Sequence, residues 1–358
     1  MSKIHNFSAG PAILPQAAIN ASVDALQNFA GTGLSLLEVS HRSKEYEAVV
    51  EEACQLVKDI LGLNDDYAVV FLQGGASLQF DMLPMNFLGE NETAAYINSG
   101  VWAGRAIKEA KMFGNVNVLA SSEDKNFSYL PKDYTIPSDA KYFHCTSNNT
   151  IYGTEMFDFP ETNGVPLVCD MSSDIFSRPF DATKFDMIYA GAQKNMGPAG
   201  TTLIIIKKSF LEKRTSRKIP TMLDYKIHID NGSMYNTPSV FAIFVCMHTL
   251  RWIKGMGLEA MELRNKEKAD LLYAEIDRNS LFVGTVAQED RSRMNVNFVL
   301  NDKSMEDEFL KLCKARNLSG LKGHRSVGGL RASLYNALEL ESVQALVDTM
   351  KEFEESKK

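Results

Sequence analysis

The sequence predicts an α/β fold with a large domain built on a mostly parallel, doubly wound sheet and a small C-terminal α+β domain. Between residues 44 and 206, short apolar runs typical of buried strands alternate with helical patterns, which favours a parallel sheet covered by helices on both faces. The length of 358 residues is typical of about two domains. We therefore expect a large domain over residues 16–257 and a small domain over residues 258–358, with residues 1–15 packing near the functional site.

Composition excludes several classes of protein. The hydrophobic fraction of 45% and the charged fraction of 23% are those of an ordinary globular chain. The formal net charge of −7, without a long basic block, argues against nucleic acid as a partner. The first eight residues lack the apolar core of a signal peptide, and no apolar run is long enough to span a membrane, so we expect a cytoplasmic protein. Five scattered cysteines without a C-x-x-C motif indicate reduced thiols, and no pattern predicts a metal site.

The first elements are expected to be helices. A turn-rich entry segment, residues 6–12, looks too irregular for a strand. The helix after it carries Ile19, Val23 and Leu26 at the i, i+4, i+7 spacing of one apolar face. A second, longer helix should run from about residue 44 to 61, with Gly62 as its C-cap.

A series of strands follows, over residues 67–72, 93–97, 116–120, 141–144, 165–170, 185–190 and 203–206. Gln73-Gly74-Gly75-Ala76-Ser77 comes directly after the first strand and should open a helix. Backbone N–H groups at such a turn, together with the helix dipole, form a cradle for an anion such as phosphate. The segment is neither a P-loop nor a G-x-G-x-x-G motif, which disfavours a nucleotide site.

The C-terminal third contains longer helices. Thr237 is expected to cap an apolar helix that reaches about residue 254, with Pro238 in its first turn. Two glycines near residue 256 then separate it from an amphipathic helix over residues 258–276. A strand at 294–300, a helix at 305–316, a strand at 329–335 and a helix at 341–353 complete the predicted small domain.

Lys194 and Asp170 are the candidate catalytic pair. Lys194 lies just after a buried strand, where poor solvation favours the neutral amine that a nucleophile needs to attack a carbonyl. Asp170 ends the preceding strand, at the sheet edge where ligands bind in α/β folds. Pyridoxal phosphate (PLP) requires such a pair, a lysine for its aldehyde and an acid for its pyridinium nitrogen. The alternatives are a solvated lysine at a strand end and an aspartate that caps a turn.

Other polar and aromatic residues follow strands of the same sheet. Trp102 at a turn-to-helix junction either stacks on a flat ring or packs in the core, and Thr150 offers a hydroxyl after another strand. The tripeptide His-Arg-Ser occurs at residues 41–43 and again at 324–326, and Arg331 follows the second copy. Arginine binds carboxylate or phosphate through two hydrogen bonds, so these residues suit a substrate with two anionic groups. Surface arginines and a chance repeat remain the alternative.

The chain resembles the phosphoserine aminotransferase family. The motifs that carry the resemblance are Ser-Ala-Gly-Pro-Ala (8–12), Ser-His-Arg-Ser (40–43), Gln-Gly-Gly-Ala-Ser (73–77), Ala-Gln-Lys-Asn-Met-Gly-Pro-Ala-Gly (192–200) and Gly-His-Arg-Ser-Val-Gly-Gly-Leu-Arg-Ala-Ser (323–333). Their order and spacing match the family from about residue 4 to residue 355.

The resemblance implies a class-V, fold-type I PLP-dependent transferase that works as a homodimer. Such an enzyme (EC 2.6.1.52) exchanges an amino group between O-phospho-L-serine and 2-oxoglutarate, giving 3-phosphohydroxypyruvate and L-glutamate in serine biosynthesis. The resemblance also leaves open a second substrate, 4-phosphohydroxy-L-threonine, in pyridoxine biosynthesis.

The resemblance also implies residue roles. Lys194 would bind the cofactor covalently and move a proton, Asp170 would pair with the pyridinium, Trp102 would stack on the ring and Thr150 would bind the ring hydroxyl. The residues expected at the cofactor phosphate are Ala76, Ser77 and Gln193, with Asn236 and Thr237 of the neighbouring subunit. The residues expected at the substrate are Arg331 for the α-carboxylate, His41, Arg42, His324 and Arg325 for the phosphate or γ-carboxylate, and Ser8 nearby. Many relatives carry another pair in place of Ala76-Ser77, which matters little where backbone donors dominate.

Other functions fit the same pattern less well. An alanine–glyoxylate aminotransferase or a cysteine desulfurase would share the PLP fold, and a PLP-binding protein without turnover would share the cofactor site. A desulfurase needs a reactive cysteine on an exposed loop, whereas Cys145 and Cys169 lie in or beside apolar strands, where thiols are more often inert.

Overall fold

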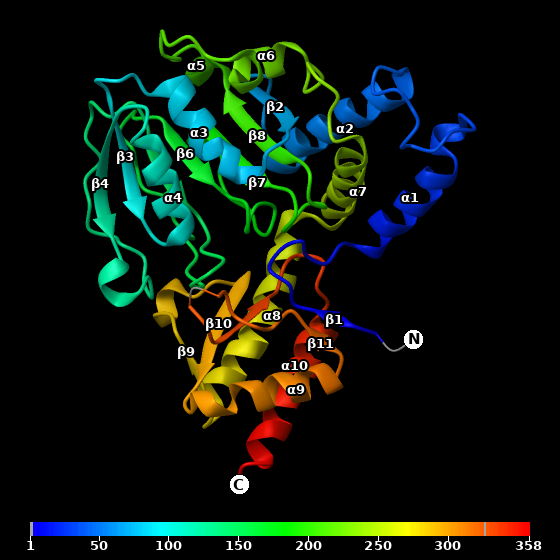
Figure 1. Ribbon diagram of the computed structural model, residues 1–358, viewed down its shortest axis with the longest axis vertical. Helices are drawn as coiled ribbons and strands as arrows, with labels where there is room; N and C mark the ends of the chain where they lie inside the picture. The colour runs from blue at the N-terminus through cyan, green and yellow to red at the C-terminus, as the bar shows by residue number, and fades with distance from the viewer. Residues whose placement is uncertain (1–2, 326) are drawn as a thin grey trace.

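The computed structural model describes residues 3–325 and 327–358, so Ser326 of the second His-Arg-Ser motif lies outside the described residues. A seven-stranded sheet and its helices form the upper part of the molecule, and a three-stranded sheet with three helices forms the lower part (Figure 1). In the described ranges no helix is long and apolar enough to cross a membrane.

The large sheet has the strand order β2-β8-β7-β6-β5-β3-β4. Only β8 runs antiparallel to its neighbours β2 and β7, and all other adjacent pairs are parallel. The predicted mostly parallel sheet is therefore confirmed. Its strands are β2 (Tyr67–Leu72), β3 (Thr93–Asn98), β4 (Asn115–Ser121), β5 (Phe143–Thr146), β6 (Leu167–Asp170), β7 (Met187–Gly191) and β8 (Thr202–Lys207).

Both faces of this sheet are covered by helices, as the near-continuous apolar character of the strands requires. On one face Val69 and Phe71 join the core formed with α1 (Gln16–Gln27), α2 (Lys44–Leu61) and α7 (Val240–Met256). On the other face Val70 and Leu72 join the core formed with α3 (Gly75–Phe87) and α4 (Val101–Ala110). Alternate residues of one strand thus serve two cores, which makes the sheet doubly wound.

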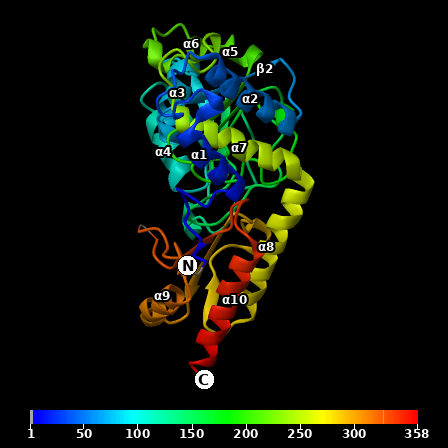
Figure 2. The same cartoon turned by 90° about the vertical axis from the view of Figure 1, so that its right-hand side faces the viewer.

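The lower part is built on antiparallel strands. β10 (Asn295–Leu300) pairs with β9 (Phe282–Gly284) on one side and with β12 (Leu330–Ser333) on the other. Helix α8 (Leu258–Arg278) descends from the end of α7 and packs beside α10 (Leu340–Glu355), with α9 (Glu306–Ala315) nearby (Figure 2).

The N-terminal segment belongs to this lower part. β1 (His5–Asn6) pairs in parallel with β11 (Leu318–Ser319), and Phe7 is buried in the third apolar core. The expectation that residues 6–12 contain no strand was wrong at Asn6. The chain returns to the upper part at Ala12, whose N–H donates to the Gln193 carbonyl at 3.0 Å.

Helix α2 has the predicted boundaries. The Ser43 hydroxyl accepts a hydrogen bond from the Tyr46 N–H at 3.3 Å and so caps the first turn. Gly62 ends the helix with φ +64°, a conformation that favours glycine.

The apolar spacing in α1 gave the wrong buried face. Ile19, Val23 and Leu26 have 40%, 51% and 38% of their surface exposed. The helix instead packs smaller side chains, among them Ala18 and Ala25, toward α7. Small residues let two helices approach closely, so the larger apolar side chains are left facing outward.

Several other predictions were wrong at the level of boundaries. α7 begins at Val240 and has Ser239 rather than Thr237 at its N-cap, because the Gln73 side chain holds the Thr237 carbonyl outside the helix with a 2.9 Å hydrogen bond. The strand expected at 141–144 is β5, which begins two residues later. The sequence patterns also missed β9, β11 and two short helices, α5 (Lys208–Leu211) and α6 (Tyr225–Asp230).

Candidate active site

The site lies where β5, β6 and β7 end side by side. Asp170 is the last residue of β6, Thr150 follows β5, and Lys194 follows β7. Because these three strands are parallel neighbours, their carboxyl ends meet at one edge of the sheet. The Lys194 ammonium nitrogen donates to the Thr150 hydroxyl at 2.6 Å. The structure therefore brings together three predicted residues that are far apart in sequence.

The Lys194 amine is electrostatically unusual. Burial lowers its pKa to about 8, which the negative charge of Asp170 opposes and the positive charge of Arg331 assists. A lysine in water has a pKa of about 10.4. Near neutral pH a useful fraction of this amine is therefore uncharged and able to attack a carbonyl.

The Asp170 carboxyl is buried and held in place. Its Oδ1 accepts hydrogen bonds from the Ser172 N–H at 2.9 Å and from the Ser172 hydroxyl at 2.6 Å. Burial raises its pKa, while the Ser172 hydroxyl bond and the charge of Lys194 oppose that rise. With Oδ1 occupied by Ser172, Oδ2 is left to bind a protonated ring nitrogen.

The Trp102 indole forms one wall of the site. Its ring centre lies 5.8 Å from the Lys194 nitrogen, and its buried Nε1 has no hydrogen-bond partner among the described residues. Gly100 sets the entry into α4, because a Cβ on that residue would come within 1.9 Å of the Asn149 amide nitrogen. Trp102 also packs against the core of the sheet, so the two readings of this residue are compatible.

The N-terminus of α3 provides the predicted anion cradle. Gly74 is the N-cap with φ +93°, and no side chain caps the helix, so the first N–H groups, including those of Ala76 and Ser77, are available to a ligand. The Gln73 side chain before the cradle bonds both to the Thr237 carbonyl at 2.9 Å and to the Asn236 amide at 3.3 Å. Within this chain, Asn236 and Thr237 therefore lie next to the residue that precedes the cradle.

Arg331 reaches the site from the lower part. One of its terminal nitrogens donates to the Thr150 carbonyl at 3.1 Å, while its Nε is buried and has no partner among the described residues. Burial lowers the pKa of its guanidinium. Arg331 thus touches the same residue as Lys194 does, and an anion bound to it would lie next to the amine.

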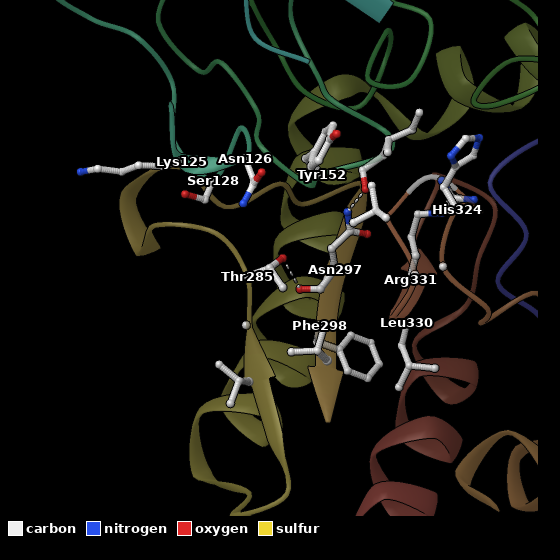
Figure 3. A pocket seen from close by; sticks show the side chains of 17 residues that line it. Lys125, Asn126, Ser128, Tyr152, Thr285, Asn297, Phe298, His324, Leu330 and Arg331 are labelled. Atoms are coloured by element: carbon white, nitrogen blue, oxygen red, sulfur yellow. Dashed lines mark hydrogen bonds between the residues drawn. The ribbon is translucent and has the colours of Figure 1, made fainter. Parts of the chain in front are cut away.

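A cleft of about 560 Å³ opens beside Arg331, between the upper and lower parts (Figure 3). Asn297 of β10 lies directly opposite Arg331 of β12 and donates to the Ile151 carbonyl at 2.5 Å. His324 lies at the same end of the cleft as Arg331 (Figure 3), and burial together with the charges of Arg331, Arg325 and Arg105 lowers its pKa. Arg105 and Asn297 are site residues that the sequence analysis missed, because neither lies in a recognisable motif.

Three further predicted residues lie in two places: Ser8 in the N-terminal segment, and His41 and Arg42 in the turn between α1 and α2. Ser8 lies close to Gly320, where a Cβ would come within 2.5 Å of the Ser8 nitrogen. Nearby, Gly10 approaches the Lys194 side chain, since a Cβ on it would be 3.3 Å from Lys194 Cγ. The turn that holds His41 and Arg42, between α1 and α2, lies on the outer side of the upper part, away from the loop before β12 (Figure 1). The structure does not bring His41 and Arg42 to Lys194 of the same chain.

The assembled groups fit pyridoxal phosphate. An amine of lowered pKa, a buried carboxylate with one oxygen left to bind, an aromatic wall and an uncapped helix N-terminus correspond to its aldehyde, ring nitrogen, ring face and phosphate. In the described ranges, no group of three or more His, Cys, Asp or Glu side chains could hold a metal ion.

Comparison with known proteins defines the class. The family model Aminotransferase class-V matches residues 4–346, and the chain belongs to this family. Solved structures with the same fold include an alanine–glyoxylate aminotransferase from Nostoc, which is 15% identical with a TM-score of 0.77 and shows the fold alone.

Within this family the similarity to phosphoserine aminotransferases is much higher. The chain is 60% identical to the phosphoserine aminotransferase of Flavobacterium psychrophilum, over 98% of this chain and 99% of that one. The corresponding protein of Bacteroides fragilis is 58% identical, again over 98% and 99%. The solved phosphoserine aminotransferase of Bacillus circulans is 45% identical, covers 99% of both chains and superposes with a TM-score of 0.97. A PLP-bound phosphoserine aminotransferase from Trichomonas vaginalis, 39% identical, covers 98% of this chain and 100% of its own, with a TM-score of 0.92.

Proposed function

We propose that the protein is a PLP-dependent phosphoserine aminotransferase that interconverts O-phospho-L-serine and 2-oxoglutarate with 3-phosphohydroxypyruvate and L-glutamate. One observation carries the proposal: Thr150 contacts both the Lys194 amine through its hydroxyl and Arg331 through its carbonyl. This arrangement sets a nucleophilic amine beside a carboxylate clamp, as the transamination of an amino acid requires. The relatives at 54–60% identity, all named phosphoserine aminotransferase, support the choice of substrate, and serine biosynthesis is the expected role.

The cofactor side of the site is assigned as follows. PLP, when bound, supplies an electron sink that lets the α-hydrogen of the amino acid leave as a proton. Lys194 would bind the cofactor and then carry that proton, for which a pKa of about 8 suits operation near neutral pH. Asp170 would hold the ring nitrogen protonated, Trp102 would cover the ring, and Thr150 would orient the ring hydroxyl. The phosphate would be held by Ala76, Ser77 and Gln193, with Asn236 and Thr237 of a second subunit.

The substrate side is assigned by charge. Arg331 would bind the α-carboxylate that all amino-acid substrates share. The distal group, a phosphate in one half-reaction and a γ-carboxylate in the other, would be bound by His324 and Arg325, with His41 and Arg42 of a second subunit, and Ser8 would lie near the substrate. Both distal groups are oxyanions, so one cationic pocket can serve both.

The assembly we propose is a homodimer. Leu34 and Leu37, just before His41 and Arg42, are exposed apolar side chains. Met222 and Tyr235, before Asn236, are exposed as well. Exposed apolar residues beside segments that are expected to serve a second active site support a subunit interface there.

Each subunit would consist of a large domain over residues 16–257 and a small domain over residues 258–358, with residues 1–15 packed near the active site. The glycine at 257, where α7 passes into α8, is the natural boundary, since its φ of +80° lets the chain turn. A biosynthetic enzyme of this kind would work in the cytoplasm.

A single-turnover panel tests the proposed function. The holoenzyme is mixed separately with phosphoserine, glutamate, alanine, serine, cysteine and 4-phosphohydroxythreonine, and the cofactor absorbance is followed. Phosphoserine and glutamate should convert the cofactor rapidly to its amine form, and alanine and serine should do so only slowly. Equal reaction with alanine or unphosphorylated serine would contradict the proposal, and an unchanged spectrum with every donor would indicate a PLP-binding protein without turnover.

A further inference from the structure

Arg105 is a cationic residue of this site that no motif singles out. It lies on α4, three residues after Trp102, and its guanidinium carbon is 4.8 Å from the centre of the Trp102 ring. We propose that Arg105 is a further anion-binding residue of the substrate site and favours amino acids whose distal group carries two negative charges. The inference rests on the proposed function, because it assigns Arg105 to the same substrate.

Most arginines of the chain have counter-charges, and Arg105 has none. Eight arginines form ion pairs with carboxylates: Arg178, Arg214, Arg217, Arg251, Arg278, Arg291, Arg293 and Arg316. Arg264 donates to two backbone carbonyls instead. In the part of the chain that the structure describes, five arginines have no acidic partner: Arg42, Arg105, Arg264, Arg325 and Arg331. Three of these five, Arg42, Arg325 and Arg331, are the arginines expected to bind substrate anions, and Arg105 resembles them in having no acidic partner.

Arg105 lies within electrostatic range of His324, another residue expected at the substrate. The charge of Arg105 adds to those of Arg331 and Arg325 in lowering the pKa of His324. Arg105 lies on α4 of the upper part, and His324 lies in the loop before β12 of the lower part (Figure 1). Positive charges that converge without a carboxylate raise the free energy of the site unless an anion lies between them.

The Trp102 ring determines where the guanidinium lies. Residues three apart on a helix are neighbours, and a guanidinium that stacks on an indole keeps its N–H donors at the edge free for an oxyanion. The Lys194 nitrogen lies 5.8 Å from the same ring centre. One indole therefore lies next to both the amine that handles the α-carbon and a cation suited to the distal group.

The two distal groups differ in charge, which makes the contribution of Arg105 selective. A phosphate monoester carries close to two negative charges above its second pKa of about 6, and a γ-carboxylate carries one. Arg105 should therefore contribute more to phosphoserine binding than to glutamate binding. It should contribute nothing to the binding of alanine, which has no distal anion.

The experiment compares holoenzyme variants in steady-state kinetics. Arg105→Gln removes the charge, Arg105→Lys keeps the charge without the planar fork, and Lys108→Gln removes one charge from the same helix at a residue that pairs with Glu109. We expect Arg105→Gln to raise KM for phosphoserine about tenfold and KM for glutamate about threefold, with kcat little changed. Arg105→Lys should fall between wild type and Arg105→Gln, and Lys108→Gln should match wild type. Inorganic phosphate should inhibit Arg105→Gln about tenfold more weakly than it inhibits wild type.

The outcomes separate this inference from the proposed function. Wild type that fails to convert phosphoserine overturns the proposed function. Wild type that converts it, while Arg105→Gln changes both KM values equally or neither, overturns the role of Arg105. Arg105→Gln could instead lower kcat and alter the cofactor absorbance while the ratio of KM for phosphoserine to KM for glutamate stays unchanged. Such a result would show that Arg105 only supports Trp102, and it would also overturn the anion-binding role. If Arg105→Gln does not fold, Arg105→Met, which also removes the charge and keeps the apolar stem, replaces it, and an unchanged ratio of the two KM values overturns the role of Arg105.

Discussion

The chemistry of a buried residue in this protein depends on which hydrogen-bond partners surround it. Lys194 and Lys268 illustrate the contrast. Lys268 is buried and donates to the carbonyls of Leu334 and Tyr335 at 2.7 and 2.8 Å, so its hydrogen bonds are used inside the fold. Lys194 donates to the Thr150 hydroxyl, and burial lowers its pKa to about 8, so part of the amine is neutral and able to react with a carbonyl compound. The same residue type thus holds elements of the lower part together in one place and is suited to covalent chemistry in the other.

The lowered pKa of Lys194 predicts how the apoprotein captures PLP. The neutral amine is the reactive form. Below its pKa of about 8, the neutral fraction increases about tenfold with each unit rise in pH, and above that pKa it is nearly constant. The rate of covalent attachment, followed by absorbance, should therefore rise with pH and level off near pH 8. A rate that keeps rising to pH 10 would contradict the lowered pKa. Borohydride reduction followed by peptide mapping should find the pyridoxyl group on Lys194, and Lys194→Ala should bind PLP without a covalent bond.

Two arginines should differ in which substrates they affect. Arg331→Ala removes the partner of the shared α-carboxylate, so KM should rise for every amino acid, by about 10- to 150-fold for loss of a charge-assisted bond of about 1.5–3 kcal/mol. Arg325→Ala should raise KM for phosphoserine and glutamate while leaving slow reaction with alanine unchanged. Both variants should retain the cofactor absorbance of wild type. A selective effect of Arg331→Ala on phosphoserine alone would reverse the two assignments.

At the scale of elements, helix ends and strand ends position the site. α3 and α4 both begin at the carboxyl edge of the large sheet, with Gly74 and Gly100 at their N-caps, and so deliver the anion cradle and Trp102 to Lys194. β10 and β12 present Asn297 and Arg331 side by side from the lower part. Asn297 bonds to Ile151, next to Thr150, and this contact ties the lower sheet to the site.

Two glycines allow a matched test of backbone conformation in helices. Gly62 has φ +64° after α2, while Gly255 lies within α7, and neither would bring a new Cβ near another atom. Gly62→Ala should lower the free energy of unfolding by about 1 kcal/mol, because alanine is strained in the left-handed region. Gly255→Ala should raise it by about 0.5 kcal/mol through helix propensity and reduced freedom of the unfolded chain. Urea unfolding followed by circular dichroism measures both, and equal shifts in the same direction would contradict the argument.

At the scale of the whole molecule, the exposed apolar residues are the main unexplained feature of a single chain. Ile19 and Val23 on α1 and Leu37 before α2 lie outside every core of the monomer. Exposure of large apolar side chains in one region favours association, at about 25 cal/mol per Å² of apolar surface removed from water. A homodimer that covers them would also explain why His41 and Arg42 lie away from Lys194 of their own chain.

Charge substitutions test the assembly. Val23→Asp and Leu37→Asp should shift sedimentation at micromolar concentration from dimer toward monomer and lower activity in proportion, because a buried unpaired charge is costly. Met112→Asp, at an exposed methionine after α4, is the matched control and should sediment as wild type does. An active monomer, or variants that remain fully dimeric, would contradict the proposed interface.

The sequence by itself determined the order and type of most elements and the position of Lys194 and Asp170 at one edge of the sheet. Strands such as β2 and β8 are short apolar runs bounded by polar turns, and Gly62 marks the end of α2 through its own conformational freedom, so local patterns were sufficient. Lys194 and Asp170 were likewise predictable, because a polar residue directly after a buried strand must lie at the edge of the sheet.

Only the tertiary structure decided which faces and which distant residues come together. α1 has two possible buried faces, and the choice depended on the close approach of α7 to its small side chains, a contact that no local period encodes. Arg105 and Asn297 carry no motif. Asn297 lines the cleft because β10 pairs with β12, and Arg105 lies over the Trp102 ring because both residues are on one face of α4. The local spacing of residues determines which secondary structure a segment can form. The burial and charge at a site depend on residues that are distant in sequence and come into contact only when the chain folds.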